Sequence, residues 1–287
     1  MIVITGASGQ LGRLVIEALL QTVPAGEIVA AVRHPEKVAD LAARGVQVRV
    51  ADYDQPASLA AAFAGADNLL LISANEVGRR VPQHRAVIEA AKAAGVGLLA
   101  YTSLLHADTS PLPLAAEHQE TEALIRASGL PAVILRNGWY TENYLAGIPT
   151  ALQYGVVLGS AGDGRIASAA RADYAAAAAA VLTQDDQAGR IYELAGDASY
   201  TLAELAGEIA KQSGQAVNYQ NLPESEFKAA LLGAGLPDFL VTLLAESDVG
   251  ASKGGLFDDS RQLSQLIGRP TTSLANMVAA QLAATAA

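Results

Sequence analysis

The chain has 287 residues, of which 51% are hydrophobic, and at roughly 150 residues per domain we expect two lobes around a large core. Its formal net charge is −10 at pH 7 and it has no run of Lys or Arg, so the sequence argues against a nucleic-acid-binding protein. Without cysteine it cannot form a disulfide, use a catalytic thiolate or bind zinc through cysteine.

The chain also lacks the signals of a membrane or exported protein. No segment reaches the roughly 20 consecutive apolar residues that a transmembrane helix needs. Residues 1–6 read as a strand, with no charged region before an apolar stretch as in a signal peptide. We therefore expect a cytoplasmic protein with no membrane insertion.

The first half alternates short apolar runs with amphipathic stretches. The runs predict strands at residues 2–5, 28–32, 46–50, 68–72, 97–101 and 132–135, and the stretches predict helices near 10–21, 36–43, 56–64, 82–94 and 115–128. The predicted strands are apolar throughout, as in a parallel sheet covered on both faces. This alternation indicates an α/β fold with a doubly wound parallel sheet, the Rossmann architecture, over residues 1–137.

After residue 137 the pattern becomes mostly helical. We expect a helix at 142–153, a Gly-rich segment at 155–164, an Ala-rich helix at 173–182 and a strand at 191–194 that belongs to the first lobe. Thr201 and Glu204 have the spacing of a capping box that opens a further helix. Residues 138–287 are thus predicted to form a smaller C-terminal lobe on the substrate side, interleaved with the first. Its helices are equally compatible with a structural role or with formation of a homo-oligomer.

A glycine motif follows the first predicted strand and opens the first helix. Gly6 permits a sharp turn, Gly9 lets the backbone approach a pyrophosphate, and Gly12 lets the helix lie close to the sheet. The N–H groups at the helix N-terminus favour the phosphates. A glycine-rich turn without a ligand is the alternative. The loop expected to bind the dinucleotide comprises Gly6, Ala7, Ser8, Gly9, Gln10, Leu11 and Gly12.

The end of the second strand indicates which dinucleotide is bound. A free ribose 2′-hydroxyl is usually met by Asp or Glu about 20 residues beyond the glycine motif. Here the strand ends in Arg33, whose guanidinium suits a 2′-phosphate, so NADPH is favoured; the alternative is an ordinary solvated charge. Asp52 lies where an adenine amino group is expected, or caps the next turn. Ser73 and Asn75, after the fourth strand, either contact the cofactor or are simply polar loop residues.

A further polar and aromatic stretch follows the sixth strand, at the carboxyl edge of the predicted sheet. Gly138 permits close backbone approach to the nicotinamide carboxamide, and Trp139 or Tyr140 offers a flat surface, unless these rings only pack in the core. With Asn137 they complete the residues that we expect at the cofactor. Asn143 is expected to reach an acceptor oxygen from the following helix.

Together these residues show a resemblance to a known family. Residues 6–12, Arg33, 101–103 and 136–143 resemble the NmrA-like group of atypical short-chain dehydrogenases, and residues 101–111 and 248–260 carry a closer similarity to its bacterial type 2 NAD(P)H:quinone oxidoreductases. The resemblance implies NADPH binding, direct hydride transfer to a small-molecule quinone without flavin, and a substrate cleft between the lobes.

The sequence departs from ordinary short-chain dehydrogenases, which use Tyr-x-x-x-Lys for proton exchange. None of the nine tyrosines has a Lys four residues later; His118 replaces the Lys and Leu114 the Tyr. Alcohol–ketone interconversion and sugar-nucleotide epimerisation by that mechanism are therefore disfavoured. Hydride transfer to a quinone gives a hydroquinone monoanion, which water can protonate. The loss fits either a quinone reductase or an NADP(H)-sensing regulatory protein without turnover.

Three residues are candidates for catalysis: Asn143, His118 and Lys253. His118 would donate a proton or bond the nicotinamide ribose, unless it is a polar residue on the solvent side of its helix. Lys253, in a Gly-rich loop, would stabilise negative charge on the acceptor oxygen, unless it is a solvated turn residue. His84 and His106 have no further ligand at metal spacing, so we expect no metal site.

Overall fold

The computed structural model describes residues 1–286, which separate into two compact units. The first unit comprises Met1–Asp108, Leu114–Asn137 and Arg171–Glu193; the second comprises Thr109–Pro113, Gly138–Ala170 and the described residues from Leu194 onward. The first unit is therefore discontinuous. It takes up residues 171–193, whose Ala-rich helix the sequence pattern had assigned to the second lobe.

The first unit is built on a seven-stranded sheet. Its strand order, β3-β2-β1-β4-β5-β6-β8, is that of a Rossmann fold with one added strand, and the pairs from β3 to β6 are parallel. Val3 of β1 lies opposite Val29 of β2 and Leu69 of β4, and all three are fully buried. The predicted doubly wound parallel sheet is confirmed. The strands are β1 (Ile2–Thr5), β2 (Ile28–Val32), β3 (Gln47–Val50), β4 (Asn68–Leu71), β5 (Leu98–Leu104), β6 (Ala132–Asn137) and β8 (Ile191–Leu194).

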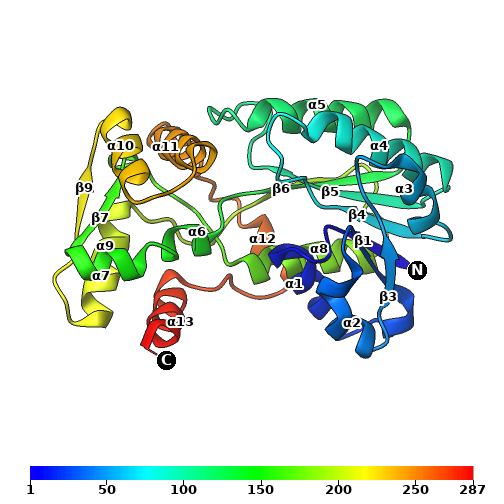
Figure 1. The fold of residues 1–287 in the computed structure, drawn as a ribbon, viewed down its shortest axis with the longest axis horizontal. Helices are drawn as coiled ribbons and strands as arrows, with labels where there is room; N and C mark the ends of the chain where they lie inside the picture. The colour runs from blue at the N-terminus through cyan, green and yellow to red at the C-terminus, as the bar shows by residue number, and fades with distance from the viewer. Residues whose placement is uncertain (287) are drawn as a thin grey trace. The chain divides into compact units, whose positions relative to one another are not determined.

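Helices cover both faces of this sheet. Figure 1 shows α3, α4 and α5 along one face and α1 and α8 on the other, where they pack together. Phe63, Val87, Leu99 and Ile125 belong to the core beneath α3, α4 and α5. The helical segments of the unit are α1 (Gln10–Leu19), η1 (Ala25–Glu27), η2 (Pro35–Val38), α2 (Ala39–Ala43), α3 (Pro56–Ala62), α4 (Arg80–Ala93), α5 (Ala115–Ser128) and α8 (Arg171–Thr183).

The second unit combines helices with a small two-stranded parallel sheet of β7 (Val156–Gly159) and β9 (Asn218–Asn221), which the sequence pattern did not predict. The single helix expected at 142–153 is two helices, because Pro149 has no N–H for an intrahelical hydrogen bond and starts a new helix after Gly147. The helices are α6 (Thr141–Leu145), α7 (Ile148–Tyr154), α9 (Leu202–Ser213), α10 (Glu224–Gly233), α11 (Asp238–Ser252), α12 (Gln262–Ile267) and α13 (Leu274–Ala286).

Two sets of polar contacts stabilise the second unit: a capping box at the start of α9 and the hydrogen bonds of a buried aspartate in α11. The predicted capping box is confirmed: the Thr201 hydroxyl accepts from the Glu204 N–H, and the Glu204 carboxylate accepts from the Thr201 N–H. Asp248 of α11 is 5% exposed and accepts from the Ser160 N–H at 2.9 Å and from the Tyr144 hydroxyl at 3.4 Å. Burial raises the pKa of Asp248 to about 6.

Among the described residues, no helix combines the length and apolar character needed to cross a bilayer.

Candidate active site

The glycine loop connects β1 directly to α1. Gly6 has φ +60°, a left-handed conformation that favours glycine, and its carbonyl accepts from the Gly9 N–H at 2.9 Å. A Cβ on Gly12 would lie 2.5 Å from the Gly6 oxygen and 2.7 Å from the Ala7 Cα. Gly12 is thus required by the loop's own backbone.

The N-terminus of α1 is open to a ligand. Gly9 is its N-cap and provides no side-chain cap, so the N–H groups of the first turn keep their donor capacity. Ala7 and Leu11 are buried and anchor the loop, whereas Gly9 and Gln10 are exposed and Ser8 is half-buried. This arrangement fits a phosphate group, which accepts such N–H donors at the positive end of the helix dipole.

Arg33 lies at the end of β2, with a side chain 53% exposed and its Nη1 atom 3.3 Å from Glu76 Oε1. Arg33 is thus an exposed side chain with a carboxylate partner, and both interpretations of it, phosphate ligand and solvated charge, stay open. Sequence reasoning missed this partner because Glu76 is 43 residues away, in the loop after β4. In an open α/β sheet, the loops that follow parallel strands lie together at the carboxyl edge of the sheet, and this brings the loop after β4 close to the end of β2.

Asp52 caps its own turn. One carboxylate oxygen accepts from the Asp54 N–H at 3.1 Å and the other from the Gln55 amide at 3.0 Å. This is the capping role that the sequence left open. Both oxygens retain a second lone pair, so an adenine amino group remains a compatible further donor.

The loop that carries Ser73 and Asn75 is held by buried groups behind it. The Ser73 N–H donates to the Thr102 hydroxyl at 2.9 Å and the Ala74 N–H to His84 Nε2, also at 2.9 Å. Burial lowers the pKa of His84 to about 3, so its imidazole is neutral and can accept this hydrogen bond. Asn75 itself is exposed. Sequence reasoning had set His84 aside as isolated; its role is to fix this loop.

His118 is buried, with 5% exposure, so the alternative of a polar residue on the solvent side is wrong. Its Nε2 accepts from Arg80 Nη1 at 3.3 Å, which leaves Nδ1–H to donate to the Tyr101 hydroxyl at 2.7 Å. Burial and the charge of Arg80 lower the pKa of His118 to about 3. A neutral imidazole with both nitrogens engaged fits a positioning role better than that of a proton donor.

A buried ion network joins the carboxyl-end halves of β5 and β6 to α5. Arg136 donates to both oxygens of Glu122, at 3.0 and 2.9 Å, and to Glu193 at 2.8 Å. Ser103 donates to the same Glu122 at 2.6 Å. The carboxylates raise the pKa of Arg136 above its ordinary value. This network holds β6 in place, and Asn137 directly follows Arg136 in that strand.

Asn137 ends β6, and the carbonyl oxygen of its side chain lacks a partner. It is 4% exposed, and its Oδ1 atom has no hydrogen-bond donor. Buried carbonyl oxygens are rarely left unsatisfied, because losing water without a replacement costs free energy. An acceptor of this kind at the carboxyl edge fits an N–H or O–H donor of a bound cofactor.

The remaining predicted residues lie in the second unit. Gly138 donates through its N–H to Leu194 O at 2.7 Å, and Trp139 is buried at 8% exposure, which favours the packing interpretation for its ring. Tyr140 is half-buried and forms a bridge to Ala169. Asn143, in α6, is exposed.

Lys253 is also in the second unit and exposed, at the C-cap of α11. The Gly-rich loop predicted around Lys253 begins only at that residue, because α11 continues to Ser252.

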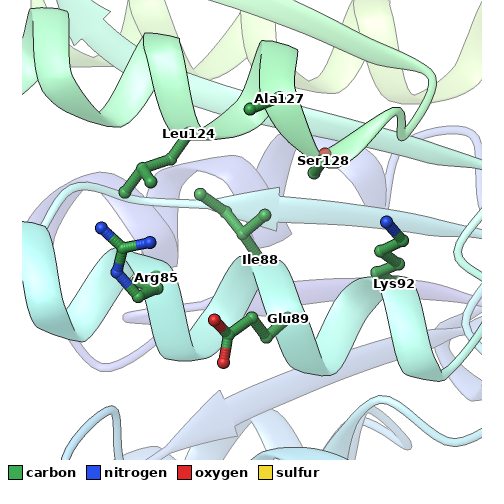
Figure 2. A pocket seen from close by; sticks show the side chains of 7 residues that line it. All are labelled: Arg85, Ile88, Glu89, Lys92, Leu124, Ala127 and Ser128. Atoms are coloured by element: carbon green, nitrogen blue, oxygen red, sulfur yellow. The ribbon is translucent and has the colours of Figure 1, made fainter.

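No group of three or more His, Asp or Glu residues within the described chain is arranged to bind a metal. The groove in Figure 2 lies between α4 and α5 and has a volume of about 190 Å³. Its lining comes from the later parts of these two helices, which run back toward the amino edge of a parallel sheet. It is therefore separate from the glycine loop. It is lined by Arg85, Ile88, Glu89, Lys92, Leu124, Ala127 and Ser128.

Comparisons with known proteins agree with this geometry. A family model described as NAD(P)H-binding matches residues 6–185. Quinone oxidoreductase 2 of Escherichia coli is 63% identical over 278 residues, which are 97% of each chain. An NmrA-like family domain-containing oxidoreductase of Aspergillus flavus is 32% identical and covers 78% of this chain and 75% of its own.

A solved structure shows the same similarity. The crystal structure of an NADPH-dependent quinone oxidoreductase from Escherichia coli, complexed with NADPH, superimposes with a TM-score of 0.97 at 62% identity. The match covers 98% of this chain and 100% of that chain.

Proposed function

Because the chain belongs to the NAD(P)H-binding, NmrA-like family, we propose that it catalyses the NADPH-dependent two-electron reduction of quinones to hydroquinones without a flavin. The observation that carries the proposal is the open N-terminus of α1 behind a glycine loop, in a chain similar along nearly its whole length to quinone oxidoreductase 2.

The first unit would hold the cofactor at the carboxyl edge of its sheet. We propose that the glycine loop binds the pyrophosphate, that Arg33 binds the 2′-phosphate and that Asp52 accepts from the adenine amino group. Ser73 and Asn75 would contact the middle of the cofactor. The unpartnered Oδ1 of Asn137 would accept from the nicotinamide end, where the Gly138 to Tyr140 backbone follows.

Bound NADPH supplies a hydride, and one proton from water completes the hydroquinone. The chain needs no strong acid for this step, since the hydroquinone monoanion is protonated by solvent. Its own task is to orient the acceptor and to stabilise charge on the acceptor oxygen. We propose that Asn143 donates to that oxygen and that Lys253 provides a positive charge. His118, neutral and bonded to Tyr101 and Arg80, would keep the helices behind the cofactor edge in place.

The test is oxidation of NADPH by the purified protein with a soluble benzoquinone or naphthoquinone, followed at the absorbance band of the reduced nicotinamide. We expect turnover that depends on quinone, and a protein spectrum without flavin absorbance. Tight NADPH binding with no turnover across several quinones would contradict the proposal and indicate an NADP(H)-sensing protein. Bound flavin would contradict only the part of the proposal that has hydride pass directly from NADPH to the quinone.

A further inference from the structure

The carboxylate of Glu76 joins two arginines, Arg33 and Arg79, near the carboxyl edge of the sheet. Glu76 Oε1 lies 3.3 Å from Arg33 Nη1, and Glu76 Oε2 lies 2.9 Å from Arg79 Nη1. Arg79 also contacts Asp54, with its Nη2 atom 3.0 Å from Oδ1. The two guanidinium groups therefore lie next to each other on opposite oxygens of a single side chain. Glu76 and Arg79 were not among the predicted site residues.

This cluster lies close to the glycine loop. Tyr53, adjacent to Asp54 in sequence, donates its hydroxyl to Thr5 Oγ1 at 2.5 Å, and Thr5 directly precedes Gly6. The same hydroxyl lies 3.0 Å from the carbonyl oxygen of Ile72, the residue directly after β4. The ends of β1, β2 and β3 thus meet the loop after β4 at the place where the adenosine end of a dinucleotide binds in this type of sheet.

We propose that Arg33 and Arg79 form a clamp for the 2′-phosphate, and that Glu76 occupies the clamp in the free protein and sets the discrimination between NADPH and NADH. The inference rests on the cofactor part of the proposed function. The four side chains, Arg33, Arg79, Glu76 and Asp54, sum to zero charge. A phosphate monoester brings a charge of about −1.5 to −2, so it satisfies both arginines and repels Glu76.

The exposure of the cluster makes this exchange feasible. Glu76 is 31% exposed and the two arginines are 53% and 60% exposed, and ion pairs in water contribute little. Glu76 can therefore turn away when a stronger anion arrives. A cofactor with a free 2′-hydroxyl brings no such charge and leaves the Glu76 pairs in place. Glu76 therefore competes with the 2′-phosphate of NADPH and does not compete with the 2′-hydroxyl of NADH.

Binding of 2′,5′-ADP and of 5′-AMP, measured by calorimetry at low salt, tests the clamp without any quinone. Glu76→Gln should tighten 2′,5′-ADP binding about 2- to 5-fold. Arg79→Gln should weaken it on the order of 10-fold. Both variants should leave 5′-AMP affinity within a factor of about two, and both effects should shrink as salt is raised. Arg85→Gln changes an exposed arginine of α4 in the groove of Figure 2; it is the charge-matched control and should change neither affinity.

Two results would overturn the inference: an Arg79→Gln variant whose preference for 2′,5′-ADP over 5′-AMP equals that of the wild type, or a Glu76→Gln variant that binds 2′,5′-ADP more weakly. Arg79→Lys, which keeps the charge, guards against a folding artefact and should retain part of the preference. Failure of quinone reduction would leave these binding results unaffected. The clamp and the proposed reaction therefore fail separately.

Discussion

Arg33 is the side chain to which we assign the choice between NADPH and NADH. Its fork of N–H groups suits a phosphate, and a hydrogen bond to a charged group contributes roughly 1.5–3 kcal/mol, or about 10- to 150-fold in affinity. Arg33→Asp should therefore lower kcat/KM for NADPH by at least this factor, because the new carboxylate also repels the phosphate. NADH should be spared, since Asp can accept from a free 2′-hydroxyl.

The measurement is kcat/KM for NADPH and NADH at fixed quinone, in wild type and variant. Thermal stability should hardly change, since Arg33 is half exposed at the end of its strand. An NADPH/NADH ratio that stays within a factor of about two, or roughly 0.4 kcal/mol, would show that Arg33 is not a phosphate ligand.

Lys253 provides a second test at the scale of one residue. If its ammonium stabilises charge on the acceptor, Lys253→Ala should lower kcat with quinone on the order of 10- to 100-fold. The Kd for NADPH should change by less than about twofold, and Lys253→Arg should recover part of the rate because it restores the charge. Lys211→Ala, at another exposed position in the second unit, is the control. Unchanged kinetics would identify Lys253 as a solvated turn residue.

Residue identity alone could not predict the partners of these side chains. The motif placed Arg33 at the correct strand end, but the pairing with Glu76 depends on where the loop after β4 lies. His118 was placed on the correct helix, but the sequence left open whether it faces the site or the solvent, because the 14 residues of α5 mix polar and apolar side chains on more than one face. Burial of a polar residue is set by its neighbours, Tyr101 and Arg80, which are distant in the sequence.

At the scale of the element, the first turn of α1 depends on Gly12. A Cβ there would meet two backbone atoms of the loop at 2.5 and 2.7 Å, and neither can move aside without changing the turn at Gly6. Gly12→Ala should lower stability by about 1–3 kcal/mol and weaken NADPH binding, because the loop must shift away from the phosphates. Thermal unfolding with and without NADP⁺ measures both effects.

Gly207 is the matched control, since it lies within helix α9 and a Cβ there would meet no atom within 4 Å. Gly207→Ala should raise stability by about 0.5–1 kcal/mol through helix propensity. A Gly12→Ala variant with wild-type stability and NADP⁺ response would mean that the loop tolerates the methyl group.

Elements with a strong local signal were predicted well. The apolar runs located β1, β2, β4 and β6 to within two residues, and the capping box located the start of α9. By contrast, β9 has the sequence Asn-Tyr-Gln-Asn, with no apolar alternation, and is a strand only because it pairs with β7. Two strands that pair although more than 50 residues separate them in the sequence leave no signal in the local composition of either one.

At the scale of the whole molecule, Asp248 gives stability a specific pH dependence. Its folded pKa of about 6 lies above its ordinary value of 3.8, so the folded state binds more protons between these two pH values. The stabilisation that protonated Asp248 gives to the folded state is therefore complete below pH 3.8 and is lost as the pH rises through 6. Asp248→Asn keeps an acceptor for the Ser160 N–H without the buried charge. It should raise the free energy of unfolding at pH 7.5 by about 1–3 kcal/mol.

The measurement is Tm from pH 4 to 8 for both proteins, with Asp248→Ala as the variant that loses the acceptor. The gain from Asp248→Asn over wild type should grow between pH 4 and 7 and then level off. A difference independent of pH would show that Asp248 keeps an ordinary pKa in the folded protein.

The discontinuity of the first unit has a consequence for biosynthesis. Helix α8, which packs against α1 behind the glycine loop, is translated only after residues 138–170 of the other unit. Ribosomes add about 5–20 residues per second, so the nascent cofactor-binding unit waits for several seconds with the apolar side of α1 uncovered. A chaperone that binds exposed apolar segments would have its opportunity in this interval. Ribosome-bound chains that end before α8 should then be captured, and chains that extend beyond β8 should be released.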